Sequence, residues 1–525
     1  MPDGAAAIPT QRGCPKDTGT VVYRASMARL SLTVKTLLLA SGKAITALSA
    51  ILATVILTRT LSKTDYATHK QVLLVFSMAS PLLMMGLPRA LYYFLPGEEK
   101  RPRAVLLENL GPLFVGAVLF GLALLFGLSD LFARRFDNDA VALLALLMAP
   151  YALFMFPSNA FSACMMARDR IKPLLAFSVI SRLLLLGVLA VAAIGFGTAA
   201  ATLGAQVAWA VAAGVVAIYL MLRVTRGGTE RTPRLRGVVE QLKFSIPLGL
   251  ASMLGALSSQ LDKYIVSDLC STEAFAIYVT GALEIPLIGI VTGAMNAVVL
   301  PELAKFYKAG ETDRIVDLWQ RAMNKALLIL IPVMFVILLL GVELVIVLFS
   351  SAYEDAADPL RIYALMLPQR AAVYGSVLMA TNNTRYVTAA ALLGLTLNVG
   401  LSIIFVQWMG YTGAAWASAL TTYGVVAYML RPMSRALKTP ITRLIAWKHV
   451  GQVMLAAGCP AALVWIAADF VPWPPVLRLV VLGGAYAALV AFVYEKTGIA
   501  TIRSIIDFLR GRGRRLDDVE HSEDR

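Results

Sequence analysis

Long apolar stretches alternate with short polar loops along almost the whole chain. Each stretch can cross a bilayer as a helix, because a hydrocarbon core requires roughly 20 apolar residues. We expect fourteen spans, at residues 33–58, 71–95, 106–128, 140–166, 173–194, 199–222, 244–269, 275–300, 326–349, 360–380, 387–408, 414–430, 450–470 and 476–494. The pattern therefore predicts an all-α integral membrane protein.

The distribution of Lys and Arg predicts how the spans are oriented. Of the 47 Lys and Arg residues, 34 fall on the N-terminal tail, the even-numbered loops and the C-terminal tail, and 7 fall on or beside the odd-numbered loops. Basic loops stay on the cytoplasmic side of a membrane. Both termini are therefore expected in the cytoplasm.

The two ends of the chain are polar. Residues 1–32 contain Gly and Pro and carry no apolar signal-peptide core, so we expect a disordered cytoplasmic tail. Translation from either Met1 or Met27 is compatible with this composition. Residues 495–525 form a second charged cytoplasmic tail.

Weak internal repeats predict a duplicated architecture. LSKTDYA, which starts at Leu61, resembles LCSTEAFA, which starts at Leu269, and GFGTAA from Gly195 resembles GYTGAA from Gly410. Their common order and similar offsets predict two six-helix lobes in a parallel pseudo-two-fold repeat. The expected units are the N-lobe at 33–222, a basic interlobe loop at 223–243, the C-lobe at 244–430, a basic loop at 431–449, and two extra helices at 450–494.

Several function classes lack the features that they need. The loops are too short to hold a catalytic domain, and no Walker P-loop is present, so we expect a protein that is not an enzyme. The three histidines lie far apart in the expected topology, which predicts no metal site. The net charge of +15 is scattered over many segments without an aromatic platform, which argues against nucleic acid as a partner.

Ionisable residues inside the spans are the candidates for function. A charge at the bilayer centre costs about 2.5 to 3.5 kcal/mol on insertion scales, so such a residue usually faces protein or a wet cavity. The set is mainly cationic, which suits an anionic substrate such as a lipid-linked pyrophosphate. Its members are Lys43, Arg89, Arg182, Asp262, Lys263, Glu284 and Arg370.

These residues have different expected roles. Lys43, Arg89 and Lys263 are the candidates for binding pyrophosphate, although Arg89 could equally anchor to headgroups. Asp262 and Glu284 are candidates for ion coupling or for static structural partnership. Arg182 and Arg370 are weaker candidates, because each could serve a neighbouring helix instead.

Several segments resemble the bacterial polysaccharide transporter or oligosaccharide flippase family, within the multidrug, oligosaccharidyl-lipid and polysaccharide exporter superfamily. They are ILTRTLSKTDYA after the first span, GLPRALYYFLPG, SSQLDKYIVSDL, and VLPELAKFYKAGETDRIVDLWQRAMNKAL after the eighth. The resemblance covers residues 33–430. It implies a two-lobed transporter whose spans 1, 2, 7 and 8 line a central cavity, to which Lys43, Arg89, Asp262, Lys263 and Glu284 would belong.

The resemblance also implies a location in a bacterial inner membrane, a substrate and partners. Members flip undecaprenyl-pyrophosphate-linked oligosaccharides to the periplasmic leaflet for surface polysaccharide synthesis, with a polymerase and glycosyltransferases in the same pathway. No cofactor is expected, although a proton or sodium gradient or the membrane potential could drive transport. One alternative is a lipid II flippase, but such flippases carry a cationic residue in span 2 that has no counterpart here near Met78. The other alternative is a multidrug exporter, whose cavity would favour acidic residues.

Overall fold

The described part of the chain is helical throughout. The computed structural model describes residues 32–283, 289, 299–468 and 472–500, and these form helices joined by turns and short loops. This is the arrangement that a bilayer requires, because a helix satisfies its own backbone hydrogen bonds where no water is available. The predicted all-α fold class is confirmed.

The first half of the chain forms one group of helices. They are α1 (Leu32–Thr60), α2 (Lys63–Met84), α3 (Leu87–Phe94), α4 (Pro102–Ala123), the π-helical turn η1 (Leu124–Leu128), α5 (Ser129–Arg135), α6 (Asp139–Ala145), α7 (Met148–Ser158), α8 (Phe161–Ala167), α9 (Ile171–Phe196) and α10 (Ala199–Val224).

The second half begins with α11, which lies between the two groups. The helices are α11 (Leu235–Leu269), α12 (Thr272–Gly281), α14 (Thr312–Leu348), the 3₁₀ turn η2 (Ser351–Ala356), α15 (Ala357–Ala364), α16 (Leu367–Arg370), α17 (Tyr374–Ala380), α18 (Thr384–Met409), α19 (Tyr411–Leu437), α20 (Ile441–Leu444), α21 (Trp447–Ala468) and α22 (Pro475–Thr497).

Where the structure describes them, the apolar helices agree with the expected spans in position but not in continuity. Most of the span expected at 275–300 lies outside the described residues. Seven described helices are long and apolar enough to cross a membrane. The number rises to ten if each sharply bent pair of helices counts as one span. Span 2 is divided into α2 and α3, span 4 into α6, α7 and α8, and span 10 into α15, α16 and α17. The count of fourteen stays a prediction.

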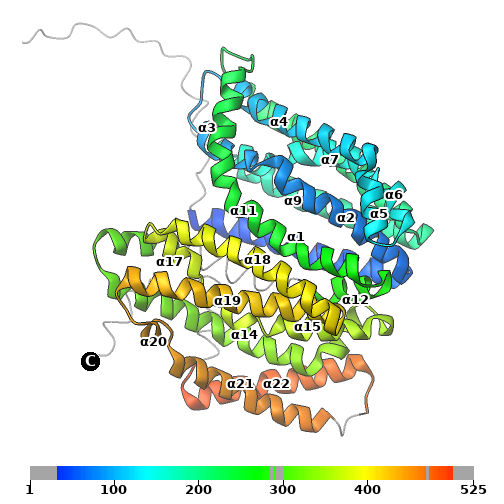
Figure 1. Cartoon of the computed structure of the whole chain (residues 1–525). Coiled ribbons are helices and arrows are strands. Elements are labelled where there is room, and N and C mark those ends of the chain that lie inside the picture. Colours follow the sequence, from blue (N-terminus) through cyan, green and yellow to red (C-terminus); the bar gives the residue numbers. More distant parts are fainter. Residues whose placement is uncertain (1–31, 284–288, 290–298, 469–471, 501–525) are drawn as a thin grey trace, which may run out of the picture.

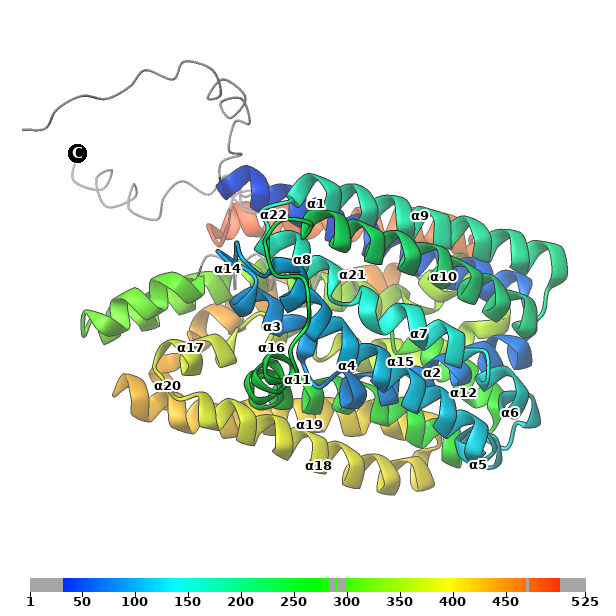
Figure 2. The same ribbon diagram turned by 90° about the horizontal axis from the view of Figure 1, so that it is seen from above.

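The helices form two groups, with α11 running between them. Figure 1 shows α2 to α10 above and α14 to α22 below, with α21 and α22 at the outer edge of the lower group. Helix α11 is bent by 59° between its segments Leu235–Pro247 and Ser252–Leu269. Its first segment is seen nearly end-on in Figure 2, beside α3.

Two turns repeat the same local structure in the two halves. Ser62 caps the N-terminus of α2 by accepting a hydrogen bond from the Asp65 amide, and Ser271 caps α12 by accepting one from the Ala274 amide. Both serines have the same extended backbone, with φ near −62° and −65°. Packing repeats as well, since α1 lies along α9 and α11 lies along α18. These likenesses agree with the expected duplication.

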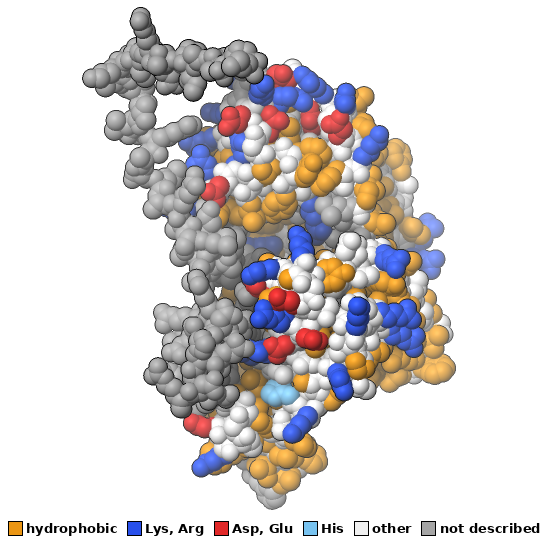
Figure 3. Space-filling view, turned by 90° about the vertical axis from the view of Figure 1, so that its left-hand side faces the viewer, with side chains coloured by type: hydrophobic (Ala, Val, Ile, Leu, Met, Phe, Trp, Pro, Cys, Tyr) orange, Lys and Arg blue, Asp and Glu red, His pale blue; other side chains and the backbone are white. Residues whose placement is uncertain are grey.

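Charged side chains gather at one end of the molecule. Figure 3 views the end that carries α3, α17 and α20, where Lys and Arg outnumber acidic side chains around a hollow between the upper and lower groups. A buried carboxylate ties two loops together there, because Glu108 binds the Arg101 side chain at 2.7 Å and accepts from the Arg234 amide at 2.9 Å. The first segment of α11 is thereby held against α4.

Candidate functional site

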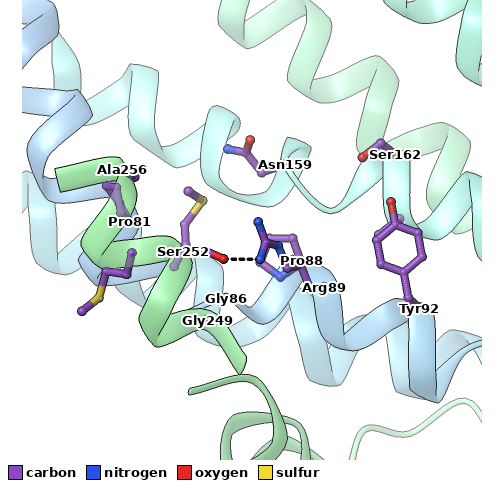
Figure 4. Close-up of a pocket in the computed structure, with 13 residues that line it drawn as sticks. Pro81, Gly86, Pro88, Arg89, Tyr92, Asn159, Ser162, Gly249, Ser252 and Ala256 are labelled. Atoms are coloured by element: carbon purple, nitrogen blue, oxygen red, sulfur yellow. Dashed lines mark hydrogen bonds between the residues drawn. The ribbon is translucent and has the colours of Figure 1, made fainter. Parts of the chain in front are cut away.

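A pocket of about 360 Å³ lies where interrupted helices meet (Figure 4). Its walls come from the α2–α3 break, the α7–α8 break and the bend of α11. Interrupted helices are where transporters build binding sites, since polar backbone groups are exposed only where they line a cavity. The described residues that line it are Pro81, Met84, Gly86, Pro88, Arg89, Tyr92, Asn159, Ser162, Ala163, Gly249, Ser252, Met253 and Ala256.

The break between α2 and α3 results from two residues in left-handed backbone conformations. Met85 has φ 46° and Gly86 has φ 71°, and the two helices they separate are bent by 41°. A Cβ on Gly86 would lie 2.8 Å from the Gly249 Cα, and a Cβ on Gly249 would lie 2.9 Å from the Gly86 Cα. Glycine at both positions therefore lets the break pack directly on the backbone of α11.

A buried amide pair holds this break in place. The Asn109 side chain, which is fully buried, donates to the Leu87 carbonyl at 2.8 Å and to the Gln241 side-chain oxygen at 2.8 Å. Gln241 in turn donates to the Val105 carbonyl at 3.0 Å. Three helices, α3, α4 and α11, are thus joined beside the break by buried side-chain hydrogen bonds.

Arg89 supplies the charge of the pocket. It lies in the first turn of α3, one residue after Pro88, and its guanidinium donates to the Ser252 hydroxyl on α11 (Figure 4). Among the described residues that line the pocket, Arg89 is the charged one. Its side chain is exposed to the cavity, so the guanidinium has donors to spare for an anionic group.

The opposite wall is polar and uncharged. Asn159 lies between α7 and α8, and Ser162 lies in the first turn of α8. The Asn159 amide donates to the Met155 carbonyl at 2.9 Å, which leaves a second N–H and a carbonyl oxygen for other partners. The pocket therefore combines one guanidinium with neutral donors and acceptors.

Asp262 lies elsewhere, in a buried cluster with two tyrosines. Its carboxylate is 4% exposed and accepts hydrogen bonds from the hydroxyls of Tyr278, at 2.8 Å, and of Tyr363. The other oxygen accepts from the Lys263 amide at 2.8 Å. These bonds join α11, α12 and α15, and they fit both of the predicted roles, ion coupling and static partnership.

Lys263 is not among the described residues that line the Arg89 pocket. Its ammonium donates to the Ser259 carbonyl at 3.1 Å and lies close enough to Lys70 for electrostatic repulsion. Eleven residues of helix separate Ser252 from Lys263, or roughly 16 Å along the axis. The structure therefore does not bring Arg89 and Lys263 together around one phosphate.

The other predicted residues fall in different places. The Lys43 side chain and Glu284 lie outside the described residues, although α1 includes the Lys43 backbone. Arg182 is exposed on α9, and Arg370 is the half-buried last residue of α16. Neither Arg182 nor Arg370 is among the described residues that line the pocket.

Sequence reasoning missed several residues of these sites. The expected spans at 33–58 and 71–95 leave Lys70 in a loop, whereas it lies inside α2, with its ammonium 5.3 Å from the centre of the Tyr66 ring. The Ser62-x-x-Asp65 capping pattern signals that early helix start. Asn159 and Ser252 carried no such signal, because neutral residues in apolar segments are not distinctive.

Sequence comparisons relate the chain to flippases. A probable lipid II flippase MurJ from Rhizobium meliloti (strain 1021) is 24% identical over 303 residues, which cover 53% of this chain and 54% of the relative. A probable low-salt glycan biosynthesis flippase Agl15 from Haloferax volcanii is 23% identical over 188 residues, which cover 35% of this chain and 39% of the relative. The match thus spans about half or less of each relative's length.

Solved structures share the fold over a greater length. An inward closed conformation of the lipid II flippase MurJ superposes with a TM-score of 0.69 at 16% identity, covering 89% of this chain and 99% of that chain. An inward-facing multidrug resistance MATE family transporter of the MOP superfamily reaches 0.57 at 15% identity, covering 75% and 96%. Residues 32–307, more than half of the chain, match the family model described as polysaccharide biosynthesis protein. The chain therefore belongs to the polysaccharide biosynthesis protein family and has the fold of MOP superfamily transporters.

Proposed function

We propose that this protein flips an undecaprenyl-pyrophosphate-linked oligosaccharide from the cytoplasmic to the periplasmic leaflet of a bacterial inner membrane. The product would feed surface polysaccharide synthesis, through a polymerase and glycosyltransferases of the same pathway. Family membership supports polysaccharide biosynthesis, and the relatives named as flippases support transport of a lipid-linked saccharide.

The observation that carries the proposal is Arg89 in a pocket of neutral polar residues. A guanidinium binds phosphate oxygens through two parallel charge-assisted hydrogen bonds. Its present partner is the neutral Ser252 hydroxyl, which a phosphate oxygen would outcompete because it carries charge. The headgroup would occupy this pocket while the prenyl tail stays in lipid.

Substrate binding would act on the bend of α11. Ser252 begins the second segment of α11. Helix α11 packs along α18, and Glu108 holds its start against the first group. A phosphate that draws Arg89 away from Ser252 would remove a contact between α3 and the second segment of α11. The two helix groups could then rock about the bend and carry the headgroup across, in the manner of alternating access.

The driving force is a further part of the proposal. Moving negative charge outward is favoured by about 2.3 kcal/mol per charge per 100 mV when the cell interior is negative. Asp262 is the candidate for a coupling proton or sodium ion, because it is a buried carboxylate on the helix that bends. Asp262→Asn would then abolish dependence on the ion gradient.

The alternative substrates are lipid II and a cationic drug. Lipid II is favoured by the relatives that carry that name. A cationic drug is disfavoured, because the described pocket lining holds an arginine and no carboxylate. Loss of a lipid II flippase would stop wall synthesis and kill the cell, whereas loss of a drug exporter would raise drug susceptibility.

A deletion strain tests the proposal. We expect surface polysaccharide to disappear while the polyprenyl-linked oligosaccharide persists or accumulates inside the cell, and the wild-type gene to restore export. Arg89→Ala should fail to restore it, and Arg89→Lys should restore it partly, since an ammonium keeps the charge but not the bidentate geometry.

Arg314→Ala is the matched control, because Arg314 is an exposed arginine on α14 that pairs with Glu311 outside the pocket. It should restore export fully at equal protein level. Full export by Arg89→Ala would contradict the assignment of the pocket. Death of the deletion strain from failed wall synthesis would replace the proposed substrate with lipid II.

A further inference from the structure

One aromatic side chain shares the pocket with Arg89. Tyr92 follows Arg89 by three residues on α3, a spacing that places both side chains on one face of a helix. Tyr92 is 46% exposed, and its ring extends toward Ser162 (Figure 4). The Tyr92 hydroxyl lies 3.6 Å from the Met166 sulfur on α8, a weak contact that holds the ring at the wall.

The groups around this ring are those that a sugar requires. Tyrosine offers a flat apolar face with a polar tip, which matches the apolar face and polar edge of a pyranose. Asn159 and Ser162 add an amide and a hydroxyl that can both donate and accept. The volume of about 360 Å³ lies near the lower end of small-molecule pockets, roughly 300 to 1,000 Å³, and suits one or two rings.

We infer that this pocket recognises the sugar next to the pyrophosphate, with Tyr92 stacking on the ring and Asn159 and Ser162 binding its hydroxyls. This inference rests on the proposed function and extends it. Arg89 binds the phosphate that every lipid-linked substrate shares, and it carries no information about the sugar. Tyr92, Asn159 and Ser162 therefore set the preference for the attached sugar.

Tyrosine at the end of a membrane helix has a second common role, as an anchor at the headgroups. The neighbouring Tyr93 fits that role, because it is 67% exposed and stacks on Phe244 at 4.8 Å, outside the residues that line the pocket. Tyr93 lies on the same helix at nearly the same depth. It is therefore the matched control for Tyr92.

Binding to the full-length protein in nanodiscs separates the two contributions. The probes are a prenyl pyrophosphate without sugar and the same lipid carrying N-acetylglucosamine or galactose. We expect the wild type to bind a sugar-bearing lipid more tightly than the bare lipid. Tyr92→Leu should weaken binding of the sugar-bearing lipid that the wild type prefers roughly three- to tenfold, and it should leave binding of the bare lipid unchanged. Tyr92→Phe should keep the wild-type preference for the sugar-bearing lipid over the bare lipid.

The outcomes distinguish this inference from the proposed function. Arg89→Ala should weaken all three lipids, and Tyr93→Leu should change none. Equal binding of bare and sugar-bearing lipids by the wild type, or an equal loss for all lipids in Tyr92→Leu, overturns the sugar-recognition role alone. Absence of binding to every prenyl pyrophosphate by the wild type overturns the proposed function as well.

Discussion

The contact between Gly86 and Gly249 permits a quantitative prediction for Gly86→Ala. The new Cβ would lie 2.8 Å from the Gly249 Cα and 2.9 Å from the Ser245 carbonyl oxygen, both backbone atoms that cannot rotate away. Overpacking of this kind costs about 1 to 3 kcal/mol. The left-handed backbone, with φ 71°, adds about 1 to 2 kcal/mol for alanine. The expected loss of stability is therefore about 2 to 5 kcal/mol.

Two control glycines separate these contributions. Gly97 has φ 73° with no described atom within 4 Å of its built Cβ, so Gly97→Ala should cost only the backbone part, about 1 to 2 kcal/mol. Gly255 lies on α11 with a helical backbone and equally open space. Gly255→Ala should stabilise by about 0.5 to 1 kcal/mol, because alanine is the better helix former.

The assay is the apparent melting temperature of each purified variant in detergent, together with polysaccharide export in the deletion strain. We expect the temperatures to fall in the order Gly255→Ala, wild type, Gly97→Ala, Gly86→Ala. Export should fail only for Gly86→Ala, since displacement of α3 moves Arg89 away from the pocket. A Gly86→Ala protein that melts together with Gly97→Ala would refute the close packing of the break on α11.

Further predictions concern buried polar groups. Glu108→Ala should destabilise by about 1 to 3 kcal/mol, because it leaves the Arg234 amide without its acceptor and Arg101 with only its pair to Glu230, whereas Glu240→Ala, in an exposed pair, should cost about 0 to 1 kcal/mol. Melting temperatures of the two variants check this, and equal values would contradict it. Tyr363→Phe should cost about 1.5 to 3 kcal/mol through its bond to the Asp262 carboxylate, more than Tyr423→Phe, which loses a bond to a backbone carbonyl. A larger drop in melting temperature for Tyr423→Phe would contradict this ranking.

Much of the candidate site escaped prediction because it depends on contacts between distant segments. Arg89 was identified from its charge in an apolar span, and it lines the pocket. Lys263 was grouped with it, yet Lys263 lies farther along α11, where its ammonium donates to the Ser259 carbonyl. Asn159 and Ser252 are ordinary polar residues until the folded chain places them beside Arg89.

The sequence by itself determined the class of fold and the positions of the apolar helices. Membrane insertion depends on the summed hydrophobicity of about 20 consecutive residues, so it can be evaluated segment by segment. Helix starts such as Ser62-x-x-Asp65 are equally local. The tertiary structure alone decided where helices break and which breaks face one another. Those features depend on pair contacts, such as Gly86 on Gly249 and Asn109 on Leu87, between residues that no local pattern links.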